Sequence, residues 1–368
     1  MAPHVHGDRA APAPRRIVVT GARGYIGSRL VPALLERGHT VVATASSEPS
    51  NPPYAWADQV EWKVMDALDG DQVAAAIEGA DAVAYLVHAL DRKDFVDVDR
   101  FAAQVMCRQL AAQDVKRCVY LSGLVPDLPH DKLSPHLSSR LEVEEVLRGS
   151  KASVASLRAG VVLGAGSTSY EIIKQIASTM VVQPVPTWLR SRIQPIGVAD
   201  AITMLVHALE NDDLEGSFDI GCSEVVPYPE LLATFSREAK LLRAQLPVPL
   251  VPVKAVSTFA PLFCGAPAHT VEALIASLKH EMVCREDHYL TLEGVDTSIA
   301  EAIRASLAKE PVRGLEAHQT QPGDAAWTSS RLWPERLTGL SAPLPASARA
   351  AARTAETRAG AVLDRLLP

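Results

Sequence analysis

The sequence has no long uninterrupted hydrophobic run and no excess of positive charge. No stretch of about 18 uncharged apolar residues occurs along the chain, so no integral membrane segment is expected. The first sixteen residues, MAPHVHGDRAAPAPRR, lack the apolar central region of a secretory signal. Acidic residues outnumber basic ones, 43 against 36, which argues against a nucleic-acid partner. These absences favour a cytoplasmic protein.

Cysteine is also scarce. The chain has five cysteines, and no two of them form a Cys-x-x-Cys pair. An odd number of scattered thiols predicts neither a disulfide framework nor a zinc site, so no metal centre is expected. Residues 1–14 are rich in proline, alanine and charge, and this composition predicts a disordered N-terminus.

What the chain does contain is a regular alternation of apolar runs and amphipathic segments. The apolar runs that predict strands lie at 16–20, 40–45, 60–66, 81–87, 117–124 and 153–164. Helical patterns fill the intervals between them. Such an alternation predicts an α/β fold, a doubly wound parallel sheet with helices on both of its faces.

A glycine motif follows the first predicted strand. Gly21, Gly24 and Gly27 stand at every third position in TGARGYIG, between that strand and a helical pattern. The first glycine permits a tight turn, the second lets a pyrophosphate approach the backbone, and the third lets the helix pack closely on the sheet. The helix N-terminus adds amide donors for phosphate. The motif therefore predicts a dinucleotide-binding Rossmann domain. The other residues expected in its binding loop are Arg23, Tyr25 and Ile26.

The residues at the end of the second strand bear on which dinucleotide binds. Enzymes that use NAD usually carry an acidic residue there, which bonds the ribose 2′-hydroxyl. This chain has Thr44-Ala45-Ser46-Ser47 instead, and Arg23 lies in the glycine loop. A basic side chain and the Ser46 hydroxyl suit a 2′-phosphate, so NADP is the expected cofactor. NAD stays open as the alternative.

The pattern also divides the chain into domains. The NAD(P)-binding Rossmann domain is expected over 15–165, and a smaller C-terminal α/β lobe over 166–317 would complete the fold and hold the substrate. Residues 318–368 are rich in alanine, proline and arginine. They predict a tail whose removal leaves cofactor affinity unchanged.

The glycine motif and several later segments, spread over roughly 16–240, resemble the extended and atypical short-chain dehydrogenases/reductases. The likeness is greatest to NmrA-like proteins and to an accessory subunit of respiratory complex I. It implies an adenine-contacting turn in MDALD, a cofactor-lining exit in AYLVHAL and a catalytic serine in VYLSGL. The homodimer common in this family is also implied. The site residues that the resemblance adds are Asp66, Leu68, Leu86, Val87, His88 and Ser122.

The catalytic motif of that family is absent. Active members carry Tyr-x-x-x-Lys on the helix after the fifth strand, where this chain has SPHLSSRLEVEEVL. His136 and Arg140 have the same i, i+4 spacing, which places both on one helical face. An imidazole can donate a proton near neutral pH, whereas a guanidinium can only hold charge. Ser122, His136 and Arg140 are therefore the catalytic candidates, and a surface position for the pair stays open.

Two classes of function follow. The first is an oxidoreductase that transfers hydride between a nicotinamide and a small carbonyl or enone substrate. The second is a non-catalytic, NmrA-like protein that binds NADP(H) as a redox sensor, which the missing tyrosine and lysine favour. A sugar-nucleotide epimerase is a third alternative, although such enzymes normally keep the tyrosine. In each case the partner is a small molecule.

Overall fold

A seven-stranded, wholly parallel sheet forms the centre of the molecule in the computed structural model, which describes residues 4–5, 13–48, 51–90, 92, 94–249, 251 and 267–328. Its strands, in spatial order, are β12 (Gly216–Ile220), β7 (Ser153–Ala159), β6 (Arg117–Gly123), β5 (Ala82–Tyr85), β2 (Arg16–Val19), β3 (Thr40–Ala45) and β4 (Glu61–Val64). The predicted doubly wound parallel sheet is confirmed.

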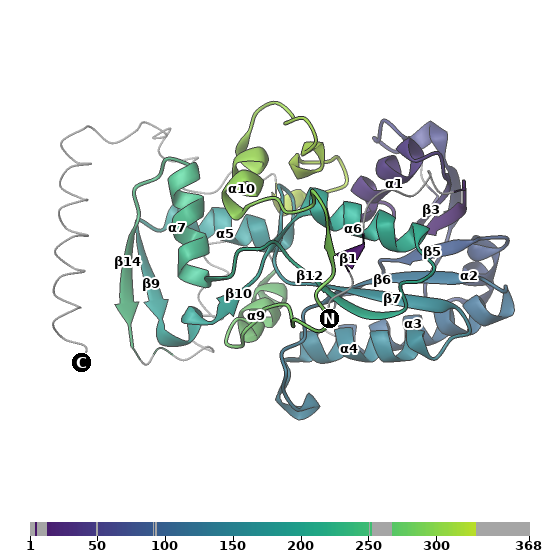
Figure 1. The fold of residues 1–368 in the computed structure, drawn as a ribbon, viewed down its shortest axis with the longest axis horizontal. Helices are drawn as coiled ribbons and strands as arrows, with labels where there is room; N and C mark the ends of the chain where they lie inside the picture. The colour runs from purple at the N-terminus through teal and green to yellow at the C-terminus, as the bar shows by residue number, and fades with distance from the viewer. Residues whose placement is uncertain are drawn as a thin grey trace.

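Helices cover both faces of this sheet (Figure 1). One face carries α1 (Gly27–Glu36) and α6 (Val198–Glu210). The other carries α2 (Gly70–Ile77), α3 (Phe95–Ala112) and α4 (Pro135–Arg148). Because both faces are covered, the central strands are continuously apolar rather than alternating, as in the buried run Ile17-Val18-Val19.

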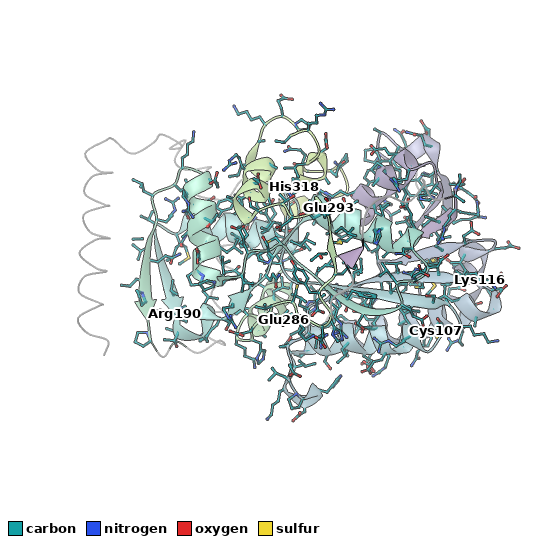
Figure 2. All side chains as sticks on the ribbon, in the orientation of Figure 1. Cys107, Lys116, Arg190, Glu286, Glu293 and His318 are labelled. Atoms are coloured by element: carbon teal, nitrogen blue, oxygen red, sulfur yellow. The ribbon has the colours of Figure 1, made fainter. Side chains whose placement is uncertain are left out.

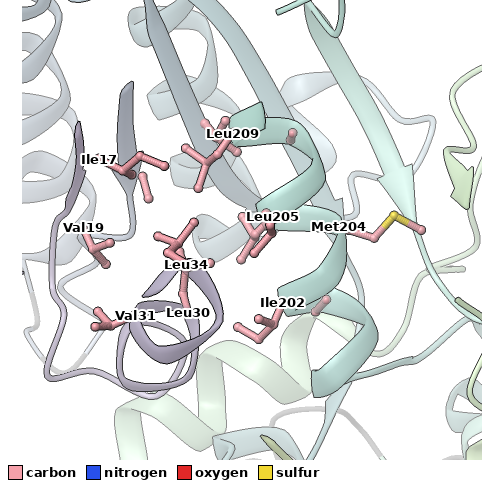
Figure 3. Close-up of a cluster of buried hydrophobic side chains, with 14 of the residues drawn as sticks. Ile17, Val19, Leu30, Val31, Leu34, Ile202, Met204, Leu205 and Leu209 are labelled. Carbon is pink, nitrogen blue, oxygen red and sulfur yellow. The ribbon is translucent and has the colours of Figure 1, made fainter. Parts of the chain in front are cut away.

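The packing of α1 against α6 fixes the start of the glycine-loop helix. Leu30 and Leu34 of α1 meet Leu205 and Leu209 of α6 above Ile17 of β2, and all five side chains are fully buried (Figure 3). Helix α1 thus packs against both strand β2 and helix α6. These contacts position its N-terminus, which faces the glycine loop.

The segment after residue 165 serves both layers of the molecule. Strand β12 joins the main sheet beside β7, with Phe218 opposite Leu157, and α6 packs on that sheet. The remainder builds a smaller layer with its own apolar core. Its helices are α5 (Thr168–Thr179), α7 (Tyr228–Glu238), α9 (Ala268–Ser277) and α10 (Ile299–Leu307). Its parallel strand pair is β9 (Val182–Pro186) with β14 (Ala244–Val248).

Short strands and 3-10 turns join these layers. The short strands are β8 (Val162–Leu163), β10 (Arg192–Ile193), β11 (Ile196–Gly197), β13 (Val226–Pro227) and β15 (Thr291–Leu292). The 3-10 turns are η1 (Ala57–Gln59), η2 (His130–Lys132), η3 (Thr187–Arg190), η5 (Glu316–His318) and η6 (Ala326–Thr328). Over the residues that the structure describes, no helix is both long enough and apolar enough to cross a bilayer.

Two expectations about the chain ends need correction. Within the N-terminal segment 1–14, His4 and Val5 form β1 and pair with β15. The predicted tail begins too early, because residues 318–328 pack on the body of the protein: His318 is fully buried and Asp324 forms a buried ion pair with Arg29. Sequence composition misplaced this boundary, since it does not register single buried side chains. Residues 329–368 lie outside the described residues.

Candidate functional site

The glycine loop adopts the tight geometry that its spacing predicts. Gly21 has a φ of +65°, in the left-handed region that favours glycine. A Cβ on Gly27 would lie 2.4 Å from the Gly21 carbonyl oxygen and 2.7 Å from the Ala22 Cα. Only glycine therefore lets α1 start this close to the loop. The N-terminus of α1 consequently faces the end of β2, where backbone amides and the helix dipole attract phosphate.

A cavity of about 700 Å³ opens above this loop, at the carboxyl ends of β2, β3 and β5. The predicted cofactor residues that line it are Gly21, Arg23, Gly24, Ser46, Asp66, Leu68, Leu86, Val87 and His88. Its volume, its glycine floor and the helix N-terminus fit a dinucleotide. In doubly wound sheets ligands bind at this edge of the strands.

The other three predicted loop residues lie beneath the loop rather than in the cavity wall. Gly27 is buried against Gly21, and Ile26 is the N-cap of α1. The Arg29 guanidinium stacks 4.0 Å from the Tyr25 ring, and burial raises the pKa of the Tyr25 hydroxyl far above its usual range. These residues shape the loop from below.

The side of the cavity next to β3 carries a basic residue, and β3 itself contains no acid. Arg23 is exposed at the rim, and Ser46 follows β3. The one acidic side chain in the cavity wall, among the described residues, is Asp66. Its carboxylate accepts a hydrogen bond from the Leu68 amide at 2.9 Å. Asp66 thereby holds the turn after β4.

A buried carboxylate orients His88 at the exit of β5. The Nδ1 atom of His88 lies 2.6 Å from Oδ2 of Asp99, on α3. Asp99 is 3% exposed and also accepts hydrogen bonds from the Ala89 amide, at 2.8 Å, and from the Ser139 hydroxyl, at 3.3 Å. Three donors, two from the loop after β5 and one from α4, therefore hold this carboxylate, and the carboxylate in turn orients the His88 ring. Sequence reasoning missed Asp99; its only signal was an acid on the otherwise apolar face of α3.

His136 lies directly beside His88. The two ring centroids are 5.5 Å apart, and His136 is placed by the first turn of α4, which the Ser134 hydroxyl caps. Burial, together with the Arg140 charge and His88, holds the pKa of His136 well below its usual 6.5. The imidazole is consequently neutral at pH 7, so it can donate a hydrogen bond but is seldom a charged acid.

Ser122 belongs to β6 and Arg140 contacts that strand, and neither lines the cavity above the glycine loop. Arg140 donates hydrogen bonds to the Tyr120 hydroxyl at 3.2 Å and to the Leu121 carbonyl at 3.4 Å. Ser122 is 4% exposed at the end of β6. The Arg140 side chain of α4 thus points toward the sheet, and its hydrogen bonds are made to β6.

A second cavity, of about 460 Å³, begins at His136 and the ends of β6 and β7. Its wall is overwhelmingly apolar and comes mainly from α5, α9 and the segment around η3. Its larger side chains are Leu137, Ile172, Ile176, Met180, Trp188, Leu189, Ile193, Tyr228, Leu232, Leu274, Ile275, Leu278 and Met282. His88 lines the first cavity and His136 the second, so the histidine pair lies where the two cavities approach each other.

Comparison with protein families agrees with this geometry. The model of a family described as NAD(P)H-binding matches residues 21–205, which is half of the chain. The chain belongs to this NAD(P)H-binding family, and the resemblance to extended and atypical short-chain dehydrogenases/reductases is confirmed. A nicotinamide cofactor is thereby supported.

Curated relatives match parts of the chain. An uncharacterised protein of Mycobacterium tuberculosis is 27% identical over 249 residues, which are 67% of this chain and 26% of that protein. The chain thus spans about a quarter of that relative's length. A ceramide reductase of Caulobacter vibrioides is 28% identical over 52% of this chain and 59% of its own. Cinnamoyl-CoA reductase 1 of Arabidopsis thaliana is 32% identical over 32% of this chain and 36% of its own.

Solved structures share the fold. The Bordetella bronchiseptica enzyme WbmH in complex with NAD⁺ has a TM-score of 0.54 at 20% identity, over 72% of this chain and 99% of its own. A short-chain dehydrogenase/reductase superfamily protein from Agrobacterium tumefaciens with bound NAD has a TM-score of 0.53 at 19% identity, over 72% of this chain and 97% of its own. At such identities the likeness concerns the fold alone.

Proposed function

We propose that this protein is an NAD(P)H-dependent reductase of an apolar carbonyl or enone compound. The observation that carries the proposal is the position of the His88–His136 pair between a cavity that fits a dinucleotide and a cavity whose wall is apolar. A hydride donor in the first cavity and an apolar acceptor in the second would meet at this pair. The ceramide reductase relative is named for an apolar substrate, which agrees with the second cavity.

The residues take distinct roles in this proposal. When bound, the reduced nicotinamide supplies the hydride, which is the chemistry of the cofactor itself. His136, neutral at pH 7, donates a hydrogen bond that polarises the substrate oxygen, and solvent supplies the proton that the product takes up after hydride transfer. Burial keeps that imidazole neutral by lowering its pKa, and the charge of Arg140 lowers that pKa further. Asp99 fixes the His88 ring at the cofactor side, and Ser122 supports the end of β6.

NADP is the proposed form of the cofactor. Arg23 and Ser46 lie at the adenosine side of the cavity, where a 2′-phosphate would be placed, and β3 ends without an acid. A guanidinium binds phosphate through charge and paired donors.

The first experiment measures turnover. We expect purified protein to oxidise NADPH in the presence of at least one member of a panel of long-chain aldehydes, quinones and enones. The His136→Gln variant should lower kcat about 100-fold, the usual scale for losing a positioned polar catalyst, with the Kd for NADPH within about twofold of wild type. His130→Gln, at an exposed histidine of η2, is the matched control. Equal kcat in the two variants would exclude the role given to His136.

A nucleotide sensor is the second candidate, because His136 and Arg140 stand where the family's tyrosine and lysine are expected. Tight NADPH binding without oxidation on any carbonyl class of the panel would favour this function over the reductase.

A further inference from the structure

We propose that residues 317–324, here called the closing segment, form a fixed wall of the cofactor cavity, and that Asp324 is the positioning residue that holds it there. The proposal concerns nucleotide affinity, so it does not depend on which reaction the protein performs. Nearly 300 residues of chain separate this segment from the glycine-loop helix on which it packs.

Arg29, in the first turn of α1, anchors the closing segment. Its guanidinium makes a two-pronged ion pair with the Asp324 carboxylate, with both N–O distances 2.8 Å. It also donates to the Ala317 carbonyl and to the Gln319 carbonyl, each at 2.7 Å. The side chains of Arg29 and Asp324 are 1% and 2% exposed. A buried guanidinium that lost its carboxylate would be left with an uncompensated charge.

The segment touches the glycine loop itself. Pro322 and Gly323 line the cofactor cavity together with Arg23 and Tyr54. A Cβ on Gly323 would lie 1.8 Å from the Tyr54 hydroxyl and 2.5 Å from the Arg23 carbonyl oxygen. The Tyr54 hydroxyl in turn donates to that same carbonyl at 3.1 Å. The backbone at Gly323 therefore packs directly against the loop that would bind the dinucleotide.

The start of the segment is fixed as firmly as its end. His318, fully buried, lies between α6 and α10, and its carbonyl accepts the Ala165 amide at 3.0 Å (Figure 2). The Gln319 side chain donates to the Ala305 carbonyl at 2.6 Å. At the other end the Asp324 carboxylate also accepts the Gln321 amide at 2.8 Å, which closes a tight turn around Pro322.

These contacts have a consequence for binding. A loop that is held in its bound shape before the ligand arrives loses less conformational freedom on binding, and its affinity is higher. The closing segment restrains Arg23 and its neighbours in this way. Releasing the segment should therefore weaken binding of both NADPH and NADH, although no residue of the glycine loop is substituted.

The test compares Asp324→Asn and Gly323→Ala with Asp287→Asn, a control at an exposed aspartate. Asp324→Asn removes the carboxylate charge from Arg29, whereas Gly323→Ala keeps the ion pair and displaces the segment from the loop. We expect the Kd for NADPH, measured by fluorescence titration, to rise at least about tenfold in both variants and to stay within twofold in the control. Hydrogen exchange of residues 21–28 in the nucleotide-free protein should become faster in both.

The outcomes of these measurements distinguish failure of this proposal from failure of the proposed reaction. If both variants keep the wild-type Kd and the wild-type exchange of residues 21–28, the proposal is wrong. If Asp324→Asn does not fold, Gly323→Ala decides by the same two measurements. A wild-type protein that binds NADPH but reduces nothing would contradict the proposed reaction. The Kd and hydrogen-exchange values of the variants could still be compared with those of wild type. Should wild-type protein bind neither nucleotide, unchanged exchange in Gly323→Ala would still overturn the proposal.

Discussion

Two arginines six positions apart in the glycine-loop region have opposite environments. Arg23 is exposed at the cavity rim, whereas Arg29 is buried and spends its donors on Asp324 and on backbone carbonyls. A guanidinium that is already fully paired has nothing left for a ligand, and an exposed one does. We therefore propose phosphate recognition for Arg23 and a structural role for Arg29, although both are arginines near the same motif.

This assignment predicts a cofactor-specific effect. Arg23→Ala should raise the Kd for NADPH about tenfold, the scale of one lost charge-assisted contact, and should leave the Kd for NADH nearly unchanged. Parallel fluorescence titrations with the two nucleotides measure both values. An equal change for NADPH and NADH would show that Arg23 does not face a 2′-phosphate.

At the scale of elements, α5 and α9 form the walls of the apolar cavity and contribute little to the main sheet. Ile172 and Ile176 of α5 meet Val271 and Ile275 of α9 in a small apolar cluster of their own. Because these helices belong to the smaller layer, their side chains can change without disturbing the glycine loop. Cavity shape and cofactor affinity are thus carried by different elements.

Filling the cavity should therefore select among substrates by length. Ile176→Trp places a larger side chain in the cavity wall. We expect KM to rise at least about tenfold for long-chain aldehydes and to change little for short ones, with the Kd for NADPH unaffected. Val181→Trp, at a 62% exposed position beyond the end of α5, is the control. A uniform change along the aldehyde series would mean that the substrate binds elsewhere.

At the scale of the whole molecule, buried histidines link stability to pH. Burial lowers the pKa of His318 to about 4, from an ordinary value of 6.5. The unfolded chain therefore takes up a proton between pH 6.5 and 4, whereas the folded chain does not. Stability is full above pH 6.5 and falls as the pH drops toward 4. His136, whose pKa is lowered in the same direction, adds to this loss.

The expected acid loss from His318 is about 3 kcal/mol, since each pKa unit corresponds to about 1.4 kcal/mol. In His318→Leu the free energy of unfolding should fall less between pH 6.5 and 4, by about that amount. Denaturant titrations at a series of pH values measure it, with the exposed His130→Gln variant as the control. Parallel curves for wild type and His318→Leu would contradict the assignment.

Much of this protein follows from local sequence. The run Thr40–Ala45 is a strand with the predicted bounds, because six consecutive residues suited to a buried parallel strand need no distant information. The glycine spacing likewise predicts the loop, since the constraint at Gly27 comes from Gly21 and Ala22, which are its near neighbours in the chain. The cavity residues Ser46, Asp66 and His88 follow from their positions after the strands.

Other features depend on contacts between distant segments. Asp99 and Asp324 are ordinary acids in the sequence, and only the fold brings them to His88 and Arg29, respectively. The low pKa of His136 likewise arises from burial, which no spacing reveals. The sequence by itself thus determined the sheet, the glycine loop and the class of cofactor, because these rest on local periodicity and backbone geometry. The tertiary structure alone decided which charges are buried, which histidines meet and which segment closes the site, because these depend on packing across hundreds of residues.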